Sequence, residues 1–223
     1  MKEKILILFA LCLFTSLNTF GQVPYFAKAP GDKNLYGYTS AKFRPGINNI
    51  ESYTTFQYGI TDYMAIGTDV YTGGKDAYWG FMLRGGYKVN KWFGIGGTAT
   101  PSFDLGDNFK FSYFTGGLFM NGAITKDAKL FWCINDWFGV NRDGSYSIDQ
   151  WTYLGYSFSI KNGDAITPMV GMTHDWKFNN NPDLAAGLYY THKMWNFYIW
   201  GNDFFKKNPR LVVGIDFKLS TKL

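Results

Sequence analysis

The stretch AYWGFMLRGGYKVNKWFGIGGTATPSF, residues 77–103, decides the fold. Before its central turn the residues alternate, so that Trp79, Phe81 and Leu83 fall on one face and the residues between them on the other. A period of two predicts a β-strand. Asn90-Lys91 then predicts a tight reversal, after which the alternation resumes. The stretch therefore predicts a β-hairpin.

The two faces of this hairpin differ in chemistry. Bulky aromatic side chains occupy one face, and small or charged residues such as Gly80, Arg84 and Gly94 occupy the other. A soluble sandwich would cover the aromatic face with a second sheet, whereas a membrane barrel turns it to lipid and gathers the polar face around a lumen. After residue 21 no window has the apolar length of a helical span, about 20 residues. A membrane-embedded chain must then be a closed barrel, because open sheet edges are not hydrogen-bonded in lipid.

The N-terminal segment predicts export. Lys2 and Lys4 precede an unbroken apolar run over residues 5–14, which is typical of a signal peptide. We assign residues 1–21 to that signal peptide, 22–32 to a short periplasmic leader with two prolines and no alternation, and 33–223 to the barrel. The positive charge is spread out without a run of five like charges, which argues against a nucleic-acid partner.

The whole chain predicts an all-β transmembrane antiparallel β-barrel of about twelve strands. Short connections alternate with mostly longer, more polar ones, as in outer-membrane barrels with short periplasmic turns. An even strand count then places the N and C termini on the periplasmic side. Aromatic residues near short turns (Tyr58, Tyr87, Phe93, Trp195) predict an interfacial girdle, and Gly116-Gly117 predicts a bulge. The expected strands cover residues 33–43, 49–60, 63–72, 77–89, 92–103, 108–122, 128–140, 150–161, 165–177, 184–192, 194–205 and 210–220.

Residues 33–223 resemble the small outer-membrane β-barrel, porin-like group of Gram-negative bacteria. The resemblance rests on the turn phrases YGITDYMAIG (residues 58–67) and GYKVNKWFGIGG (residues 86–97) and on the final strand. There Gly214, Phe217 and Leu219 match the spacing that the barrel-assembly machinery reads, although Val212 stands where that signal usually has a polar residue. The resemblance implies the bacterial outer membrane, contact with outer-membrane lipid and insertion by that machinery.

Other chemistry has weaker support in the sequence. GIGGTA (residues 94–99) fits a dinucleotide pattern, but that motif must open a helix and here a strand continues. His174 and His192 have no serine two residues away on the same face, so a lipid-modifying enzyme remains the least favoured hypothesis. Two loops, residues 104–108 and 141–145, carry oxygen ligands for calcium but are more simply turns. We expect no metal and no cofactor.

The inward face of the predicted strands is the most informative set. It carries both signs of charge, and such a row either lines a water-filled path or pairs across the interior and plugs it. The inward Tyr78, Met82, Tyr189, Tyr198 and Trp200 narrow the lumen. The polar lumen residues are Glu51, Gln57, Asp69, Arg84, Lys88, Lys110, Lys129, Asn135, Asp175, Asn196, Asn202, Asp216 and Lys218.

From this face we expect a monomeric, narrow channel for passive diffusion of small hydrophilic solutes. The residues expected to set its selectivity are Arg84, Lys88, Lys110, Asp175, Glu51 and Asp69. The alternative is a closed barrel with a structural role or with loops that bind a partner, in which the lumen is sealed.

Overall fold

The computed structural model describes residues 27–44, 50–176, 181–205 and 209–221. The predicted signal peptide, residues 1–21, lies outside the described residues, as do residues 22–26 of the predicted leader. Among the described residues, no helix combines the length and the apolarity needed to cross a bilayer.

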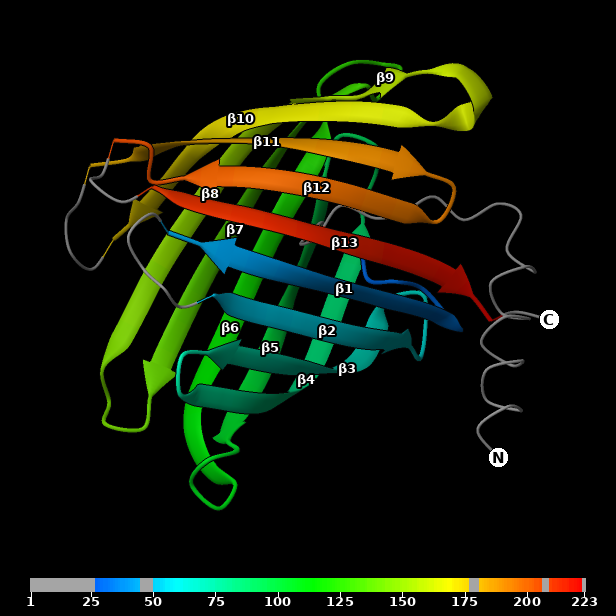
Figure 1. The fold of residues 1–223 in the computed structure, drawn as a ribbon. Coiled ribbons are helices and arrows are strands. Elements are labelled where there is room, and N and C mark those ends of the chain that lie inside the picture. Colours follow the sequence, from blue (N-terminus) through cyan, green and yellow to red (C-terminus); the bar gives the residue numbers. More distant parts are fainter. Residues whose placement is uncertain (1–26, 45–49, 177–180, 206–208, 222–223) are drawn as a thin grey trace.

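The described chain is an all-β barrel of antiparallel strands (Figure 1). Each strand pairs with its neighbour in the sequence, and the pairing of β1 with β13 closes the sheet into a ring. A short 3-10 helix, η1 (Lys161–Gly163), precedes β10. The strands are β1 (Asn34–Phe43), β2 (Glu51–Gly59), β3 (Met64–Gly73), β4 (Asp76–Lys88), β5 (Gly94–Asp104), β6 (Lys110–Ala123), β7 (Leu130–Asn141), β8 (Tyr146–Tyr156), β9 (Phe158–Ser159), β10 (Ala165–Asp175), β11 (Asp183–His192), β12 (Trp195–Asn202) and β13 (Arg210–Ser220).

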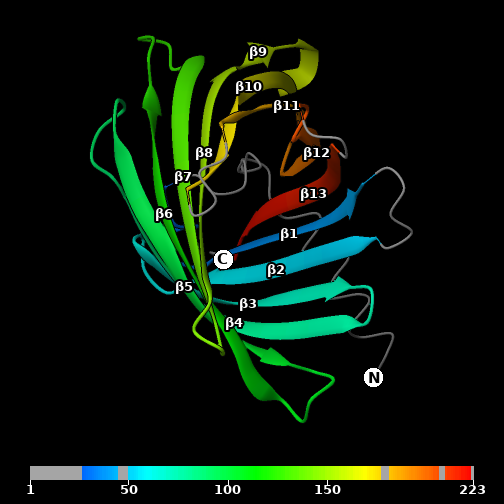
Figure 2. The same cartoon turned by 90° about the vertical axis from the view of Figure 1, so that its left-hand side faces the viewer.

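The thirteen segments make a barrel of twelve strands. β8 and β9 both pair with β10, and only Ser157 separates them, so together they form one interrupted barrel strand. β10 pairs on its other side with β11, which leaves no open edge. In Figure 2 the wall formed by β5–β8 faces the wall formed by β1–β4 and β12–β13. The predicted fold and strand number are confirmed.

The hairpin predicted from residues 77–103 forms as β4 and β5. Leu83 pairs with Ala99 and Tyr87 with Ile95, so the apolar residues of both strands share the outer face. β1 begins and β13 ends at the same end of the barrel, which also carries the short turns 60–63, 89–93 and 193–194 (Figure 1). We call this the short-turn end, and the opposite one, with connections such as 105–109 and 142–145, the loop end.

Two local predictions were wrong. The strand expected to start at residue 150 begins at Tyr146, because a tight turn over residues 142–145 replaces the longer predicted loop. The predicted bulge at Gly116-Gly117 is absent: the register shifts instead between Ser102 and Phe103 on β5. The two glycines make room for side chains, since a Cβ on Gly116 would lie 1.9 Å from the ring of Phe138.

The outer surface is apolar. Large hydrophobic side chains in mid-strand are about half exposed there, including Phe81 at 53% and Val170 at 54%. Near the short-turn end the exposed rings of Tyr63 and Tyr87 pack edge to face, with centroids 5.2 Å apart, and Tyr58 and Trp92 are exposed as well. An apolar band with aromatic side chains at its border is the surface that a membrane barrel presents to lipid.

Candidate functional site: the barrel interior

The interior of the barrel holds a cavity of about 370 Å³. It reaches the loop end, since its lining includes Lys42 at the end of β1, Ser147 at the start of β8 and Arg210 at the start of β13. Alternation along the strands brings these side chains inward, as it does for every second residue. Tyrosine and tryptophan dominate the lining, so the cavity wall is aromatic as well as polar.

One part of the wall is a row of tyrosines that we call the tyrosine arc: Tyr53, Tyr71, Tyr78 and Tyr113. Tyr71 and Tyr78 stack with ring centroids 5.8 Å apart, and Tyr78 meets Tyr113 edge to face at 5.1 Å. Each ring comes from a different strand, β2, β3, β4 and β6. All four tyrosines are half-buried. The arc therefore presents ring surface and hydroxyl groups to the cavity.

A second part of the wall, which we call the aromatic cluster, consists of Trp151, Tyr153, Tyr189, Tyr198 and Trp200. Tyr153 and Trp200 lie 4.6 Å apart although β10 and β11 separate their strands. β11 permits this approach because it carries small inward residues: a Cβ on Gly187 would lie 2.4 Å from the Trp200 ring. The Trp200 indole N–H donates to the Tyr189 hydroxyl, which fixes both rings.

A buried polar layer lies between the cavity and the short-turn end. It contains Gln57, Arg84, Asn196 and Asp216, each exposed by 2% or less. The Asn196 side-chain amide donates to Asp216 Oδ1 over 2.9 Å. The Arg84 guanidinium lies 5.4 Å from the ring centroid of Phe119. These side chains are covered and do not line the cavity, so the layer is a constriction between the cavity and the short-turn end.

The part of the leader that the structure describes enters the barrel at the short-turn end. Ala27 and Ala29 are fully buried. The Ala27 N–H donates to Asn121 Oδ1 over 2.9 Å, and Arg84 Nη2 donates to the carbonyl of Lys28 over 3.3 Å. We call residues 27–31 the leader segment. It occupies the mouth that a solute would have to pass.

The wall has glycines where the leader segment touches it. A Cβ on Gly86 would lie 1.9 Å from the Ala27 carbonyl oxygen, and one on Gly59 would lie 1.7 Å from the Gly31 oxygen. A side chain at either position is incompatible with this path of the backbone. The sequence gives no signal of that role, because glycines also suit any crowded strand face.

Of the six residues expected to set selectivity, one lines the cavity and two others lie at the loop end of β2 and β10. Asp69 lines the cavity and accepts hydrogen bonds from the hydroxyls of Tyr53 and Thr55. Glu51 is at the loop end, with a carboxylate oxygen 4.0 Å from Lys42 Nζ. Asp175 is the half-buried last residue of β10.

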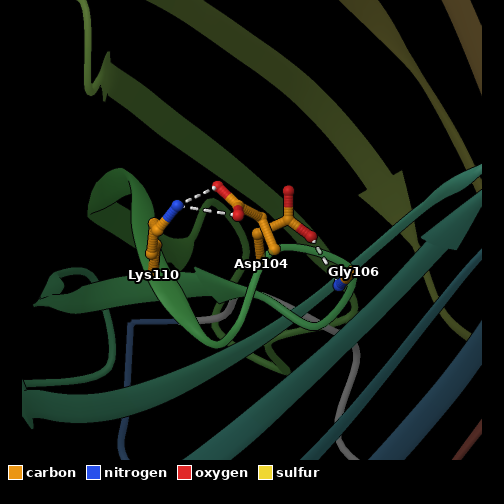
Figure 3. Close-up of polar contacts among 4 residues, drawn as sticks. Asp104, Gly106 and Lys110 are labelled. Carbon is orange, nitrogen blue, oxygen red and sulfur yellow. Dashed lines mark hydrogen bonds and ion pairs between the residues drawn. The ribbon is translucent and has the colours of Figure 1, made fainter.

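The other three do not line the cavity either, and Lys110 among them also lies at the loop end. Arg84 belongs to the buried polar layer, and Lys88 is exposed where β4 ends at the short-turn end. Lys110 forms an ion pair of 2.8 Å with Asp107 in the loop that follows β5, next to Asp104, which caps the N–H of Gly106 (Figure 3). The six residues therefore do not form one cluster, because four of them, Glu51, Lys88, Lys110 and Asp175, lie at strand ends on opposite rims.

Three charged residues of the cavity were absent from the prediction: Lys42, Arg210 and Asp149, which precedes the strand expected from residue 150. Lys42 and Arg210 both line the cavity, and both have the inward parity of their strands. The Arg210 guanidinium lies 5.9 Å from the ring centroid of Trp151. The alternation rule that assigned the other lumen residues would have found Lys42 and Arg210.

The two histidines lie on the outer face, away from the cavity. His192 Nδ1 is 2.8 Å from Asp164 Oδ1, and the ring of His174 packs 4.1 Å from that of Trp176. Hydrogen bonds lower the pKa of Asp164, which lies in the turn before β10. The bond from the Tyr190 hydroxyl has the largest effect, and the bond from His192 has a smaller one. In these contacts of the described chain, neither histidine meets a serine.

The expected alternatives in the loops and in GIGGTA can be placed as well. Gly94 opens strand β5 rather than a helix, so the dinucleotide pattern lacks its structural context. Asp143 accepts hydrogen bonds from the N–H and hydroxyl of Ser145, as in a simple turn. Within the described ranges, no group of three or more metal-ligating side chains occurs.

Comparison with known proteins gives a fold and no closer relationship. No protein-family model and no curated protein matches the sequence. A solved structure described as a KdgM porin matches with 12% sequence identity and a TM-score of 0.60, covering 82% of this chain and 98% of that one. KdgM porin in complex with disordered oligogalacturonate matches with 11% identity, the same coverage and a TM-score of 0.60. NanC porin matches with 12% identity and a TM-score of 0.54, covering 82% of this chain and all of that one. The chain therefore has the fold of these small porin barrels.

Proposed function

We propose that this protein is a monomeric channel of the bacterial outer membrane through which small hydrophilic solutes diffuse passively. The observation that carries the proposal is the cavity that opens from the loop end into a closed barrel with an apolar outer surface. The fold shared with KdgM and NanC porins supports it. Diffusion needs no cofactor, and the partners are outer-membrane lipid, the assembly machinery during insertion and the solute.

The proposed path has a wide and a narrow part. A solute enters the cavity from the loop end, passes the buried polar layer and meets the leader segment at the short-turn end. Asp69 on the cavity wall and Arg84 in the polar layer are the predicted selectivity residues that would meet a passing ion. A path this narrow excludes folded proteins.

Single-channel conductance tests the proposal. Refolded residues 22–223 are inserted into a planar bilayer, with a detergent blank, and current is recorded in a salt gradient. We expect discrete steps with a reproducible ion preference. A protein that is folded by circular dichroism but carries no current would overturn the channel.

The second candidate is a closed barrel with a structural or loop-mediated binding role. The leader segment favours it, since Ala27, Ala29 and Pro30 are buried within the short-turn mouth. This candidate predicts no conductance and a loss of partner binding when the loop at residues 142–145 is replaced. A lipid-modifying enzyme is disfavoured by the surroundings of His174 and His192; refolded protein incubated with radiolabelled lipid should give no product.

A further inference from the structure

The charges on the cavity wall balance. Among the described residues that line it, two are positive, Lys42 and Arg210, and two are negative, Asp69 and Asp149. Asp69 is engaged by two hydroxyls, and Lys42 lies 4.0 Å from Glu51 at the rim. Recognition of an anionic solute would need an excess of cationic donors, and recognition of a cationic one an excess of carboxylates. The wall has neither, so it suits an uncharged solute.

The rest of the wall combines ring faces with hydroxyl groups. The tyrosine arc and the aromatic cluster provide the rings, and Thr98, Thr100 and Ser102 on β5 add small hydroxyls. Apolar C–H groups pack favourably on the electron-rich face of an aromatic ring. A saccharide ring carries C–H groups on its faces and hydroxyls around its rim, so it matches both components. The cavity volume of about 370 Å³ is within the range of roughly 300–1,000 Å³ for small-molecule sites.

A tyrosine hydroxyl of the cavity wall is buried without a hydrogen bond to the described residues. The hydroxyl oxygen of Tyr153 is buried and has no hydrogen-bond partner among the described residues. Tyr153 is 2% exposed, and its ring is held against Trp200 at 4.6 Å. A buried hydroxyl left unsatisfied costs about 1–3 kcal/mol, so such groups in native proteins call for an explanation. A hydroxyl of a ligand in the cavity would satisfy it.

We propose that the cavity binds an uncharged ring-shaped polyol, a neutral oligosaccharide, with its rings against the tyrosine arc and the aromatic cluster and one hydroxyl bonded to Tyr153. The inference rests on the proposed function, since the binding site is the part of the solute path nearest the loop end. It adds a substrate class, which separates this chain from a porin seen with the acidic oligogalacturonate.

Binding is tested in detergent micelles, without a bilayer. Isothermal titration calorimetry of refolded residues 22–223 uses maltotriose as the neutral probe, trigalacturonate as the anionic probe and the glucosamine trimer as the cationic probe. We expect maltotriose to bind more tightly than either charged trimer. Tighter binding of a charged trimer, or no heat from maltotriose, would overturn the proposal.

Two variants localise the site, each checked for folding by heat-modifiable electrophoresis. Tyr153→Phe removes only the unpartnered hydroxyl and should weaken maltotriose binding about 5-fold, the equivalent of one net hydrogen bond. Tyr71→Leu removes one ring of the arc and should also weaken binding. Tyr58→Phe makes the same chemical change on the lipid face, where Tyr58 is exposed, and should bind like the wild type. Equal affinity of all four proteins would place the saccharide outside the cavity and reject the site.

Failure of this proposal can be told apart from failure of the channel. Ion conductance without maltotriose binding rejects the polyol site and leaves the channel intact. Maltotriose binding that Tyr153→Phe weakens, in a protein that carries no current, supports the site and rejects the channel.

Discussion

Two positive and two negative side chains lie on the cavity wall, so the loss of any one of them gives the wall a net charge. Arg210 stands at the first residue of β13 and Lys42 near the last residue of β1, so both face the loop-end entrance. In the proposed channel their charges would act on passing ions, since low-dielectric walls strengthen the field. Lys110 differs, because its ammonium is half exposed and paired with Asp107.

Arg210→Gln should shift ion selectivity toward cations. It removes one of two positive charges from the wall and leaves both carboxylates in place. The reversal potential in a KCl gradient measures the change. Lys110→Gln is the matched control, because an exposed charge outside the cavity is screened over about 10 Å at 0.1 M salt. Equal shifts for the two variants would show that the cavity wall does not set the preference.

The leader segment is the element on which the proposed conduction depends most. It belongs to no strand and is held by individual hydrogen bonds. The Ala27 N–H donates to the Asn121 side chain, and Asn34 Nδ2 donates to the carbonyl of Pro30, over 2.9 Å each. Its fit against the wall depends on the absence of side chains at the glycines below it. A single methyl group is therefore enough to disturb it.

Gly86→Ala should raise the single-channel conductance. The three atoms nearest to a Cβ at Gly86 all belong to Ala27 and Ala29, the closest at 1.9 Å, so the methyl group displaces the leader segment rather than the strand. Gly85→Ala is the control, since a Cβ there meets nothing within 4 Å. Current recordings of both variants in the same bilayer decide the matter. If Gly86→Ala conducts like Gly85→Ala, the leader segment is not the constriction.

At the scale of the whole molecule, the apolar outer band must match the membrane. Leu83 lies near the middle of β4 and is 49% exposed on the outer face. Leu83→Lys should lower the free energy of unfolding by roughly 2–4 kcal/mol, the cost of a lysine at the bilayer midplane. Val89→Lys, just past the end of β4, should cost only about 0–1 kcal/mol. Urea titration of both variants in lipid vesicles checks this; equal costs would place the band elsewhere.

The orientation of the barrel is a second property of the whole molecule. We expect the short turns to face the periplasm, as in other outer-membrane barrels. An epitope tag inserted after Gly144, in the tight turn between β7 and β8, should then be reachable by antibody on whole cells. A tag after Asn90, between β4 and β5, should not. The reverse pattern would invert the orientation.

Most of the barrel could be predicted because the two faces of a strand can be assigned from its own alternating residues. In β4 the outer face follows from Trp79, Phe81 and Leu83, and the inner face from Gly80, Met82 and Arg84. This assignment uses no information from any other strand. The same rule placed Asp69, Asn196 and Asp216 inside. The bulge predicted from Gly116-Gly117 was wrong, because these glycines make room for the rings of Phe138 and Phe119 and do not interrupt the pairing of β6.

The sequence by itself determined the twelve strands, the inward residues in the middle of the strands and the apolar outer face, because each follows from a period of two within about ten residues. Tertiary structure alone decided which inward residues meet. Closure brings β1 to β13, so that Lys33 accepts a hydrogen bond from Thr221. It also gathers Tyr153 and Trp200 into one cluster and seats residues 27–31 in the short-turn mouth. These contacts join residues far apart in the chain, and their geometry depends on strand tilt, register and side-chain volume together, none of which a local pattern contains.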